Sequence, residues 1–396
     1  MSDTREKLNI GLYGGSFDPV HAGHMRVARA FLRQQKPEKL IVMPCRVPPH
    51  KEKTAGAGGE ARLRMLRAAF AGDERIEVSD YELKKDGVSY TVETLRELGE
   101  RYPDRNILLV VGADMFLTLR DWKGSDEIFS RCTPCVYTRG DTAEALREYA
   151  AGLKRDFGVE TRFIKGRLSD LSSTALREAL AQDKRVGSAV PKSVRRIIEA
   201  TGVYRSENYR LEVYRRESER LVEDKRYRHI LRVEQAAIAL AERYGADVFK
   251  ARAAALLHDV TKRKTDEEQL AMALEFGLIG AEEFKKSPKV AHAFTGAAYA
   301  EHRLFVSDPE ILDAIRYHTT GRAGMGLLEK IIFLADGIED GRTFDGVEKL
   351  REAAFKDLDM AMLISLELTK AKVDKRGAYL HPLTADAIEY YREAVK

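Results

Sequence analysis

The sequence predicts an α/β unit built on a doubly wound parallel sheet, followed by an all-helical unit. Up to about residue 206, short β-branched runs alternate with amphipathic helical stretches, and this alternation is typical of a parallel sheet covered by helices on both faces. From Glu207 onward the only periodicity is helical, interrupted by glycine, proline and short polar turns. We therefore expect two domains, residues 1–206 and residues 207–396.

The individual strands and helices follow from local spacing. Helices are expected where apolar residues recur three and four apart, and strands where β-branched residues gather in short runs. The expected strands are Leu8–Tyr13, Lys39–Met43, Ile107–Val111, Cys135–Thr138 and Thr161–Ile164. The expected helices are Met25–Gln34, Arg62–Phe70, Thr91–Arg101 and Thr174–Ala181 in the first half, and Ile230–Tyr244, Ala251–Val260 and Leu327–Ile338 in the second.

Length and composition indicate the class of protein. A chain of 396 residues is long enough for two hydrophobic cores, and 44% hydrophobic with 33% charged residues is typical of a soluble globular chain. A net charge of +4 is too small for a nucleic-acid coat. Three cysteines favour a reducing compartment, Met1–Ile10 lacks an apolar signal region, and the apolar stretch Ile107–Leu119 is too short to span a bilayer. We expect a cytoplasmic protein that binds neither nucleic acid nor membrane, and homodimerisation is left open.

A glycine-rich turn with two histidines is the strongest short motif of the first half. Gly14-Gly15-Ser16-Phe17-Asp18-Pro19 lies between an expected strand and an expected helix, and His21 and His24 follow it. The glycines allow the backbone to approach a phosphate closely, and free N–H groups at the start of a helix attract negative charge. Histidines three apart at that point can face one phosphate. The alternative is a glycine-rich turn with two solvated histidines.

A second motif, near the end of the first half, combines hydroxyls with an arginine. Ser172, Ser173 and Thr174 begin an expected helix, and Arg177 follows one turn later. Hydroxyls at a helix N-terminus can cap the helix or bind phosphate, and a guanidinium one turn on can hold phosphate oxygens. By themselves these residues could equally be a helix cap and a surface arginine.

Together the two motifs resemble the nucleotidyltransferase superfamily that carries a His-x-Gly-His sequence, which implies a Rossmann-like doubly wound sheet. Further segments are similar to nicotinate-nucleotide adenylyltransferases in particular, and they extend over almost the whole first half. These segments are Pro48–Lys51, Tyr90–Leu95, Gly112–Phe116 with Leu119 and Trp122, Val190-Pro191, and Gly202–Tyr204.

The resemblance implies adenylyl transfer from ATP to nicotinate mononucleotide, giving nicotinate adenine dinucleotide and pyrophosphate, with Mg²⁺ carried by the ATP. The residues that it implies at the reacting phosphates are His21, His24, Lys51 and Arg177. The substrate-binding residues that it implies are Gly14, Gly15, Ser16, Phe17, Ser173 and Thr174 near the phosphates, Thr91 and Trp122 at the pyridine ring, and Gly112 and Asp114 at the nucleotide. Taken alone, Trp122 could as well be a core aromatic residue. The alternative activity is that of a related transferase that uses pantetheine phosphate or an alcohol phosphate.

Histidines and carboxylates recur in the second half in a pattern that suits a metal site. His229, the pair His258-Asp259 and Asp336 lie in three separate helical patterns. Mixed imidazole and carboxylate ligands suit iron, manganese or zinc, and they leave open positions for water and phosphate. The alternatives are a polar pair at a helix C-terminus for His258-Asp259 and a solvated carboxylate for Asp336, although an unpaired buried Asp259 is costly.

This half resembles the HD superfamily of metal-dependent phosphohydrolases, most closely its YqeK-type branch. The matching segments are Lys225–His229, Leu256–Asp259, Ala291-His292, Ala314–Gly321, Leu328–Ile332, Ala335–Glu339 and Gly341-Arg342.

The second resemblance implies symmetrical hydrolysis of diadenosine tetraphosphate to two ADP, with iron (Fe²⁺ or Fe³⁺) or another transition metal such as Mn²⁺. The metal ligands that it implies are His229, His258, Asp259 and Asp336, and the contacts to the polyphosphate or the attacking water are Arg226, His292, His318 and Arg342. The alternative is a non-catalytic domain that senses a nucleotide polyphosphate.

Three weaker signals are given structural interpretations. Cys132 and Cys135 form a lone Cys-x-x-Cys pair, which we expect to be incidental because no second pair accompanies it. The basic runs Arg62–Arg67 and Arg195-Arg196 are expected to be solvated helix faces. His302 and His381 have no motif around them and are expected to be solvated.

Overall fold

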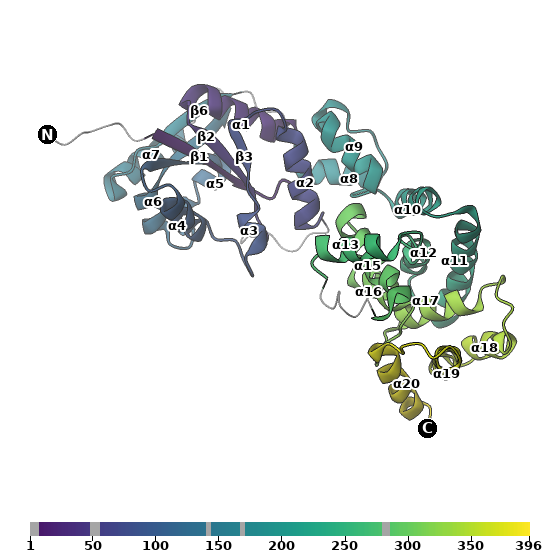
Figure 1. The fold of residues 1–396 in the computed structure, drawn as a ribbon. Helices are drawn as coiled ribbons and strands as arrows, with labels where there is room; N and C mark the ends of the chain where they lie inside the picture. Colours follow the sequence, from purple (N-terminus) through teal and green to yellow (C-terminus); the bar gives the residue numbers. More distant parts are fainter. Residues whose placement is uncertain (1–7, 48–55, 140–143, 167–170, 279–285) are drawn as a thin grey trace. The chain divides into compact units, whose positions relative to one another are not determined.

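The computed structural model describes residues 8–47, 56–139, 144–166, 171–278 and 286–396, and the chain divides into two compact units (Figure 1). The first unit is Met1–Glu199 and the second is Ala200–Lys396. Helix α9 (Lys192–Thr201) therefore runs across the division, and the predicted boundary at residue 206 coincides with the N-cap of α10 (Glu207–Leu221).

A parallel sheet of six strands is the centre of the first unit, which confirms the predicted fold class. The strands are β1 (Leu8–Gly15), β2 (Lys39–Pro44), β3 (Ile76–Val78), β4 (Arg105–Gly112), β5 (Cys132–Arg139) and β6 (Arg162–Gly166), in the order β3-β2-β1-β4-β5-β6. Since β1 pairs with both β2 and β4, the strand order reverses between β1 and β4. The carboxyl ends of these two strands are where a doubly wound sheet binds its ligand.

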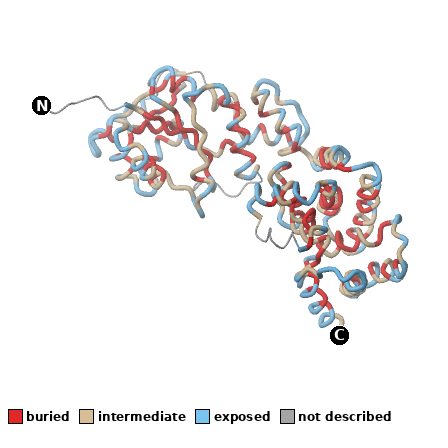
Figure 2. Tube along the Cα trace, in the orientation of Figure 1, coloured by how far each residue is buried: buried red, intermediate tan, exposed pale blue. Residues whose placement is uncertain are grey.

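Both faces of the sheet are covered by helices. Successive residues of strand β1 point to opposite faces, and each face packs against helices. On one face, Ile10 and Leu12 of β1 join the core that includes residues of α4 (Thr91–Arg101), α6 (Ser125–Arg131) and α7 (Glu144–Phe157). On the opposite face, Gly11 lies against Phe31 of α1 (Ala22–Gln35), so close that a Cβ added to Gly11 would lie 2.3 Å from the Phe31 ring. Figure 2 shows the buried residues gathered along the strands.

The helices of the first unit largely follow the predicted ranges. The expected helix Thr91–Arg101 is exact, whereas the short strand β3 had no counterpart in the predicted elements. The helices are α1 (Ala22–Gln35), α2 (Gly59–Phe70), α3 (Tyr81–Lys84), α4 (Thr91–Arg101), α5 (Ala113–Phe116), α6 (Ser125–Arg131), α7 (Glu144–Phe157) and α8 (Ser173–Ala181), with 3₁₀ turns at Leu119–Asp121 and Gly187–Ala189.

All regular secondary structure in the described residues of the second unit is helical, again as predicted. Besides α10, its helices are α11 (Asp224–Tyr244), α12 (Val248–Leu257), α13 (Asp266–Glu275), α15 (Pro288–Leu304), α16 (Pro309–Tyr317), α17 (Leu327–Ile338), α18 (Val347–Ala354), α19 (Leu358–Lys375) and α20 (Pro382–Ala394).

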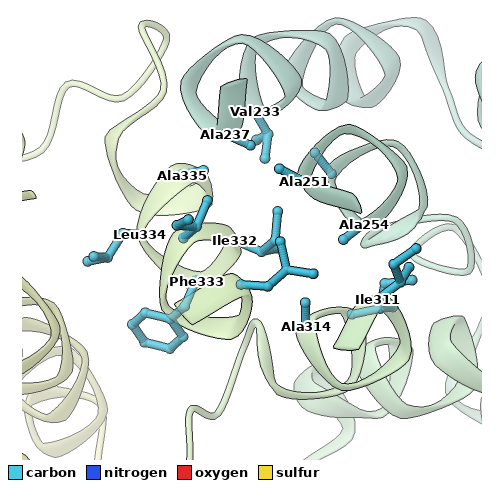
Figure 3. Packing of buried hydrophobic residues seen from close by; sticks show 14 of the residues in the cluster. Val233, Ala237, Ala251, Ala254, Ile311, Ala314, Ile332, Phe333, Leu334 and Ala335 are labelled. Atoms are coloured by element: carbon cyan, nitrogen blue, oxygen red, sulfur yellow. The ribbon is translucent and has the colours of Figure 1, made fainter. Parts of the chain in front are cut away.

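Helix α12 lies at the centre of this unit because its second half, Ala253–Leu257, is apolar and buried on every side. Its small side chains, Ala251 and Ala254 among them, let α11, α16 and α17 pack closely around it (Figure 3). The helix ends at Leu257, not at Val260 as predicted, so His258 and Asp259 follow its last turn instead of projecting from it. The apolar helix thus delivers two polar residues into the interior of the unit.

Across the residues that the structure describes, no helix combines the length and the apolar character needed to cross a membrane.

Candidate functional site

The phosphate loop, which we define as Gly14–Pro19, connects β1 to α1 at the switch point of the sheet. Gly14 is exposed at the end of β1. Phe17 adopts a positive φ of 49° and is buried, with its ring 5.2 Å from that of Tyr13 and 5.0 Å from that of His24. Positive φ is unusual for an aromatic residue and persists only where the surroundings fix the backbone.

The two histidines that follow the loop cap helix α1 with each other's help. His21 is the N-cap, and its Nδ1 accepts a hydrogen bond from the Gly23 N–H at 3.1 Å. Nδ1 of His24 accepts from the N–H of His21 at 3.2 Å. The two rings stack with centroids 3.8 Å apart. Because each Nδ1 accepts, each neutral ring carries its proton on Nε2 and can donate it to a phosphate oxygen.

Burial keeps His21 in this neutral form. Burial, together with the charge of Arg26, lowers the pKa of His21 from 6.5 to about 4. At neutral pH the His21 ring is therefore an uncharged donor, and its contribution to an anion site is a hydrogen bond and not a full positive charge.

The hydroxyl-arginine motif at the start of α8 lies against the phosphate loop, far from it in sequence. Ser172 caps α8 by accepting from the Ala175 N–H at 3.0 Å. Ser173 Oγ donates to the Pro19 carbonyl at 3.2 Å, and Arg177 Nη1 donates to the Asp18 carbonyl at 2.7 Å. A second Arg177 nitrogen donates to Thr174 Oγ1 at 3.4 Å. The structure thus brings both predicted motifs to one place.

The residues implied at the pyridine ring and the nucleotide lie at, or next to, the ends of helices and strands. Thr91 is the first residue of α4, and Trp122 follows the 3₁₀ turn Leu119–Asp121. The two segments are adjacent, since Lys123 Nζ lies 3.8 Å from the ring centroid of Tyr90.

Trp122 is partly buried against the core, and its Nε1 donates to Thr118 Oγ1 at 3.3 Å. Gly112 ends β4, and Asp114 follows it in the first turn of α5, both of them exposed at the carboxyl edge of the sheet.

One predicted catalytic residue, Lys51, lies outside the described residues, as does the rest of the Pro48–Lys51 segment. One residue of the basic run Arg62–Arg67 was interpreted wrongly. Arg62, expected on a solvated helix face, is buried, and its Nη1 donates to the Ser16 carbonyl at 2.8 Å. Cys132 and Cys135 are free and buried, and they lie on opposite faces of β5 because their separation is odd. They cannot meet as a redox pair, which agrees with the incidental interpretation.

The predicted metal donors of the second unit lie together, carried by α11, α17 and the end of α12. His229 Nε2 is 3.0 Å from Asp336 Oδ1 and 3.8 Å from Asp259 Oδ2. His258 Nε2 is 3.4 Å from the same Asp259 oxygen. Two groups have ligand atoms all within 4.8 Å of one another, namely His229 with His258 and Asp336, and His258 with Asp259 and His318.

We call His229, His258, Asp259, His318 and Asp336 the metal-donor cluster. Its imidazoles are oriented by hydrogen bonds on the side away from the cluster. Nδ1 of His258 lies 2.7 Å from the Ala255 carbonyl and Nδ1 of His318 lies 2.7 Å from the Ile315 carbonyl. Nδ1 of His229 lies 3.0 Å from Glu339 Oε1. Since a carbonyl can only accept, and Glu339 is paired with Arg232 as a carboxylate, each Nδ1 donates and Nε2 is the ring nitrogen left to bind a metal ion.

These Nε2 atoms provide a test of whether a metal ion fits the cluster. Nε2 of His229 and Nε2 of His258 are buried and make no hydrogen bond. Buried polar atoms without a partner are costly in a native protein, and here both point toward carboxylate oxygens at ion-pair distances. The donor set of imidazoles and carboxylates therefore fits a transition-metal ion.

His292, on α15, faces the cluster from another side. Its Nε2 is 3.1 Å from Asp259 Oδ1 and 3.2 Å from His318 Nε2. The ammonium of Lys262 lies 3.2 Å from its Nδ1. Burial, with the charge of Lys262 adding to it, lowers the pKa of His292 to about 4. His292 belongs to neither group of ligand atoms above, although it contacts Asp259 of the cluster.

The two predicted arginines contact the cluster through its carboxylates. Arg226 Nη1 donates to Asp259 Oδ2 at 2.9 Å, and Arg342 Nε donates to the backbone carbonyl of Asp336 at 2.8 Å while its Nη2 bonds to the Asp336 carboxylate. Although burial opposes it, the neighbouring histidines hold the pKa of Asp259 well below its usual range. The carboxylates are therefore ionised at neutral pH and ready to hold a cation.

The sequence analysis missed two residues that contact histidines of this site. Glu339 orients His229, and Lys262 contacts His292; both lie within or next to matched segments, but neither residue type at that spacing signals a role.

The interpretation of His302 and His381 as solvated residues was wrong. His302 stacks on Phe276 with ring centroids 5.0 Å apart, and His381 caps α20.

Comparisons with known proteins divide the chain in the same way. Residues 12–179 match the cytidylyltransferase-like family, and residues 226–341 match the HD domain. A probable nicotinate-nucleotide adenylyltransferase of Desulfatibacillum aliphaticivorans is 35% identical over 222 residues, which are 50% of this chain and 100% of that protein. Another, of Shouchella clausii (strain KSM-K16), is 34% identical over 199 residues, 50% of this chain and 98% of that protein.

Among solved structures, a predicted HD superfamily hydrolase involved in NAD metabolism from Clostridium acetobutylicum is 37% identical to this chain. The match covers 46% of this chain and 97% of that chain, with a TM-score of 0.45.

Proposed function

Because this chain belongs to the nicotinate-nucleotide adenylyltransferase family through its first half and contains an HD domain in its second, we propose that it is a bifunctional enzyme. The first unit transfers the adenylyl group of ATP to nicotinate mononucleotide, giving nicotinate adenine dinucleotide and pyrophosphate. The second unit hydrolyses diadenosine tetraphosphate symmetrically to two ADP, with the help of a metal ion.

In the first reaction, the 5′-phosphate of nicotinate mononucleotide attacks the α-phosphorus of ATP in line, and pyrophosphate leaves. The protein positions the two phosphates and stabilises the charge that develops on them. The Nε2–H groups of His21 and His24 donate to the α-phosphate, and the N–H groups at the start of α1 add to the same field. Mg²⁺ bound to the ATP neutralises part of the triphosphate charge.

The observation that supports this activity best is the meeting of the two motifs. Arg177 and Ser173 hold the carbonyls of Asp18 and Pro19, so the loop that precedes the histidines is fixed by the second motif. Thr91 and Trp122 then provide the pocket for the pyridine ring.

The test is a steady-state assay of the intact protein with ATP, Mg²⁺ and, in separate reactions, nicotinate mononucleotide, nicotinamide mononucleotide, pantetheine phosphate or an alcohol phosphate. We expect turnover with nicotinate mononucleotide. Turnover only with pantetheine phosphate or an alcohol phosphate would move the enzyme to a related transferase, and turnover with none of these substrates would overturn the assignment.

In the second reaction, His229, His258, Asp259 and Asp336 would hold the metal ion, with His318 as a further donor beside them. A bound ion would lower the pKa of a water molecule and offset charge on the attacked phosphorus. Arg226 and Arg342 lie at the edge of the cluster with half-buried side chains and can hold phosphate oxygens of the departing ADP. His292 donates from the remaining side to the phosphate or the attacking water.

The orphaned Nε2 atoms of His229 and His258 are the observation that favours this metal site. The test is metal analysis of the intact protein, followed by incubation with diadenosine tetraphosphate and added Fe²⁺ or Mn²⁺. We expect a bound transition metal and ADP as the sole nucleotide product. Tight binding of the substrate without any product would identify the second unit as a nucleotide sensor and contradict the hydrolase.

A further inference from the structure

Arg62 of α2 is a buried cation beside the phosphate loop. Only 7% of the residue is exposed, although a buried guanidinium is costly unless its donors are matched. In the described part of the chain, its hydrogen bonds go to backbone carbonyls and not to a carboxylate. Its position is therefore not explained by an ion pair with any neighbour that the structure describes.

The bonds of Arg62 join the start of α2 to the phosphate loop. Nη1 donates to the Ser16 carbonyl at 2.8 Å, and Nε donates to the Ala57 carbonyl at 3.2 Å. The N–H of Ala57 in turn donates to Asp18 Oδ1 at 3.0 Å. The loop is thus bound immediately before Phe17, the residue with positive φ, by α2, and immediately after Phe17 by Ala57, which lies just ahead of α2.

The α8 motif holds the loop from its other end. Arg177 binds the Asp18 carbonyl and Ser173 binds the Pro19 carbonyl. The loop is therefore held between two helices, and Arg62 provides the link that the sequence motifs do not contain. Since a strained backbone persists only where contacts over-determine it, loss of either link should let the loop relax.

We propose that Arg62 is a positioning residue of the adenylyl-transfer site. It holds the Ser16 carbonyl toward α2, so this oxygen does not face the triphosphate, and the loop keeps His21 and His24 at the helix start. The inference rests on the proposed function of the first unit, since it concerns how that unit binds ATP. Arg62 itself does not have to touch the substrate.

The test compares Arg62→Met and Arg62→Lys with Arg67→Met in the full chain. Arg67 is on the same helix with 57% of its side chain exposed, which makes it the matched control. Misplacement of a reacting group by about 1 Å costs about 100-fold, so we expect Arg62→Met to lower kcat/KM for ATP by about that factor. The KM for nicotinate mononucleotide should stay unchanged, because its ring binds at Thr91 and Trp122.

Arg62→Lys should recover part of the loss, because an ammonium can still reach one of the two carbonyls, and Arg67→Met should behave as wild type. Unfolding followed by the fluorescence of Trp122, the single tryptophan of the chain, gives the folded fraction of the first unit. A loss of activity that matches the loss of folded protein, with KM for ATP unchanged, would overturn the proposal, as would equal activities of the Lys and Met variants.

Calorimetric titration of each variant with ATP and Mg²⁺ separates this proposal from the proposed function. If the wild-type protein fails to adenylylate nicotinate mononucleotide, the substrate assignment falls, while weaker ATP binding by Arg62→Met still supports the role of Arg62. ATP affinity equal to that of the wild type would reject it.

Discussion

The phosphate loop of the first unit and the metal-donor cluster of the second unit both depend on histidine, but they use the two ring nitrogens in opposite ways. In the first, Nδ1 of His21 and of His24 accepts a backbone N–H, so Nε2 carries the proton. In the second, Nδ1 of His229, His258 and His318 donates to an oxygen, so Nε2 is the nitrogen left to bind a cation.

This difference explains how one residue type can hold an anion in one unit and a cation in the other. His21 and His24 lie at the start of a helix, where backbone N–H groups have no partner within the helix and can donate to a side chain. His258 and His318 follow the last turn of a helix, where backbone carbonyls have no partner within the helix and can accept from a side chain. The end of the helix on which the ring lies therefore selects the ligand.

The largest effect is expected when the central carboxylate of the metal-donor cluster, Asp259, is removed. A metal centre contributes several kcal/mol of charge stabilisation, so Asp259→Asn should lower hydrolysis of diadenosine tetraphosphate by about a thousandfold or more. Asp266→Asn, an exposed position on α13, is the control. Adenylyl transfer by the same sample should be unchanged, and unimpaired hydrolysis by Asp259→Asn would rule out the cluster as the reaction centre.

A pair of substitutions at His24 separates the two ring nitrogens. His24→Asn retains an oxygen near the position of Nδ1 and can still cap α1, but it has no donor at the position of Nε2. His24→Gln places an amide N–H near Nε2 instead. Loss of a donor to developing charge costs about 10²–10³-fold, so we expect His24→Asn to lose that much adenylyl transfer and His24→Gln to lose less. The reverse order of activities would show that Nδ1 is the group that matters.

The pH dependence of the stability of the first unit tests whether the buried His21 ring is neutral. Its pKa is about 4 in the folded protein and 6.5 in the unfolded chain, so the unfolded chain binds the extra proton between these values. Stability of the first unit should therefore fall as the pH drops from 6.5 toward 4, by about 3 kcal/mol. Urea unfolding followed by Trp122 fluorescence measures this loss. The variant His21→Asn should show a smaller loss, and an unchanged pH dependence would argue against a neutral buried ring.

A smaller effect is expected at Glu339, which orients His229 without belonging to the cluster. Partners that hold a metal-binding histidine typically contribute 10–100-fold to metal affinity, and we expect Glu339→Gln to weaken Mn²⁺ binding by about that range. Competition with a chromophoric chelator gives the affinity. Glu348→Gln, with 77% of its side chain exposed, should bind as tightly as the wild type, and equal affinity of both variants would remove Glu339 from the site.

Much of the fold could be predicted from the sequence because its elements follow local spacing. The predicted bounds of the helix Thr91–Arg101 agree with the structure, since its apolar residues recur at helical spacing. The strand β3 was missed because it has only three residues, with Glu77 in the middle, and forms the edge of the sheet. Helix α12 ends before His258 because the apolar run ends there, a boundary that periodicity alone does not define.

The candidate sites could be located from motifs, but their supporting residues could not. Arg62 was expected in solvent because its burial involves a contact with Ser16, which lies in a loop distant in sequence. Lys262 and Glu339 likewise act through residues on other helices. Such roles depend on tertiary contacts, which neither residue type nor spacing encodes.

The most direct test of the central claim is long-range ¹H–¹⁵N NMR of the histidine rings in the metal-free protein near pH 7.5. We predict that Nδ1 carries no proton in His21 and His24, and that Nδ1 carries a proton in His229, His258 and His318. Finding Nδ1 protonated in the first pair, or Nδ1 unprotonated in any member of the second set, would contradict this assignment.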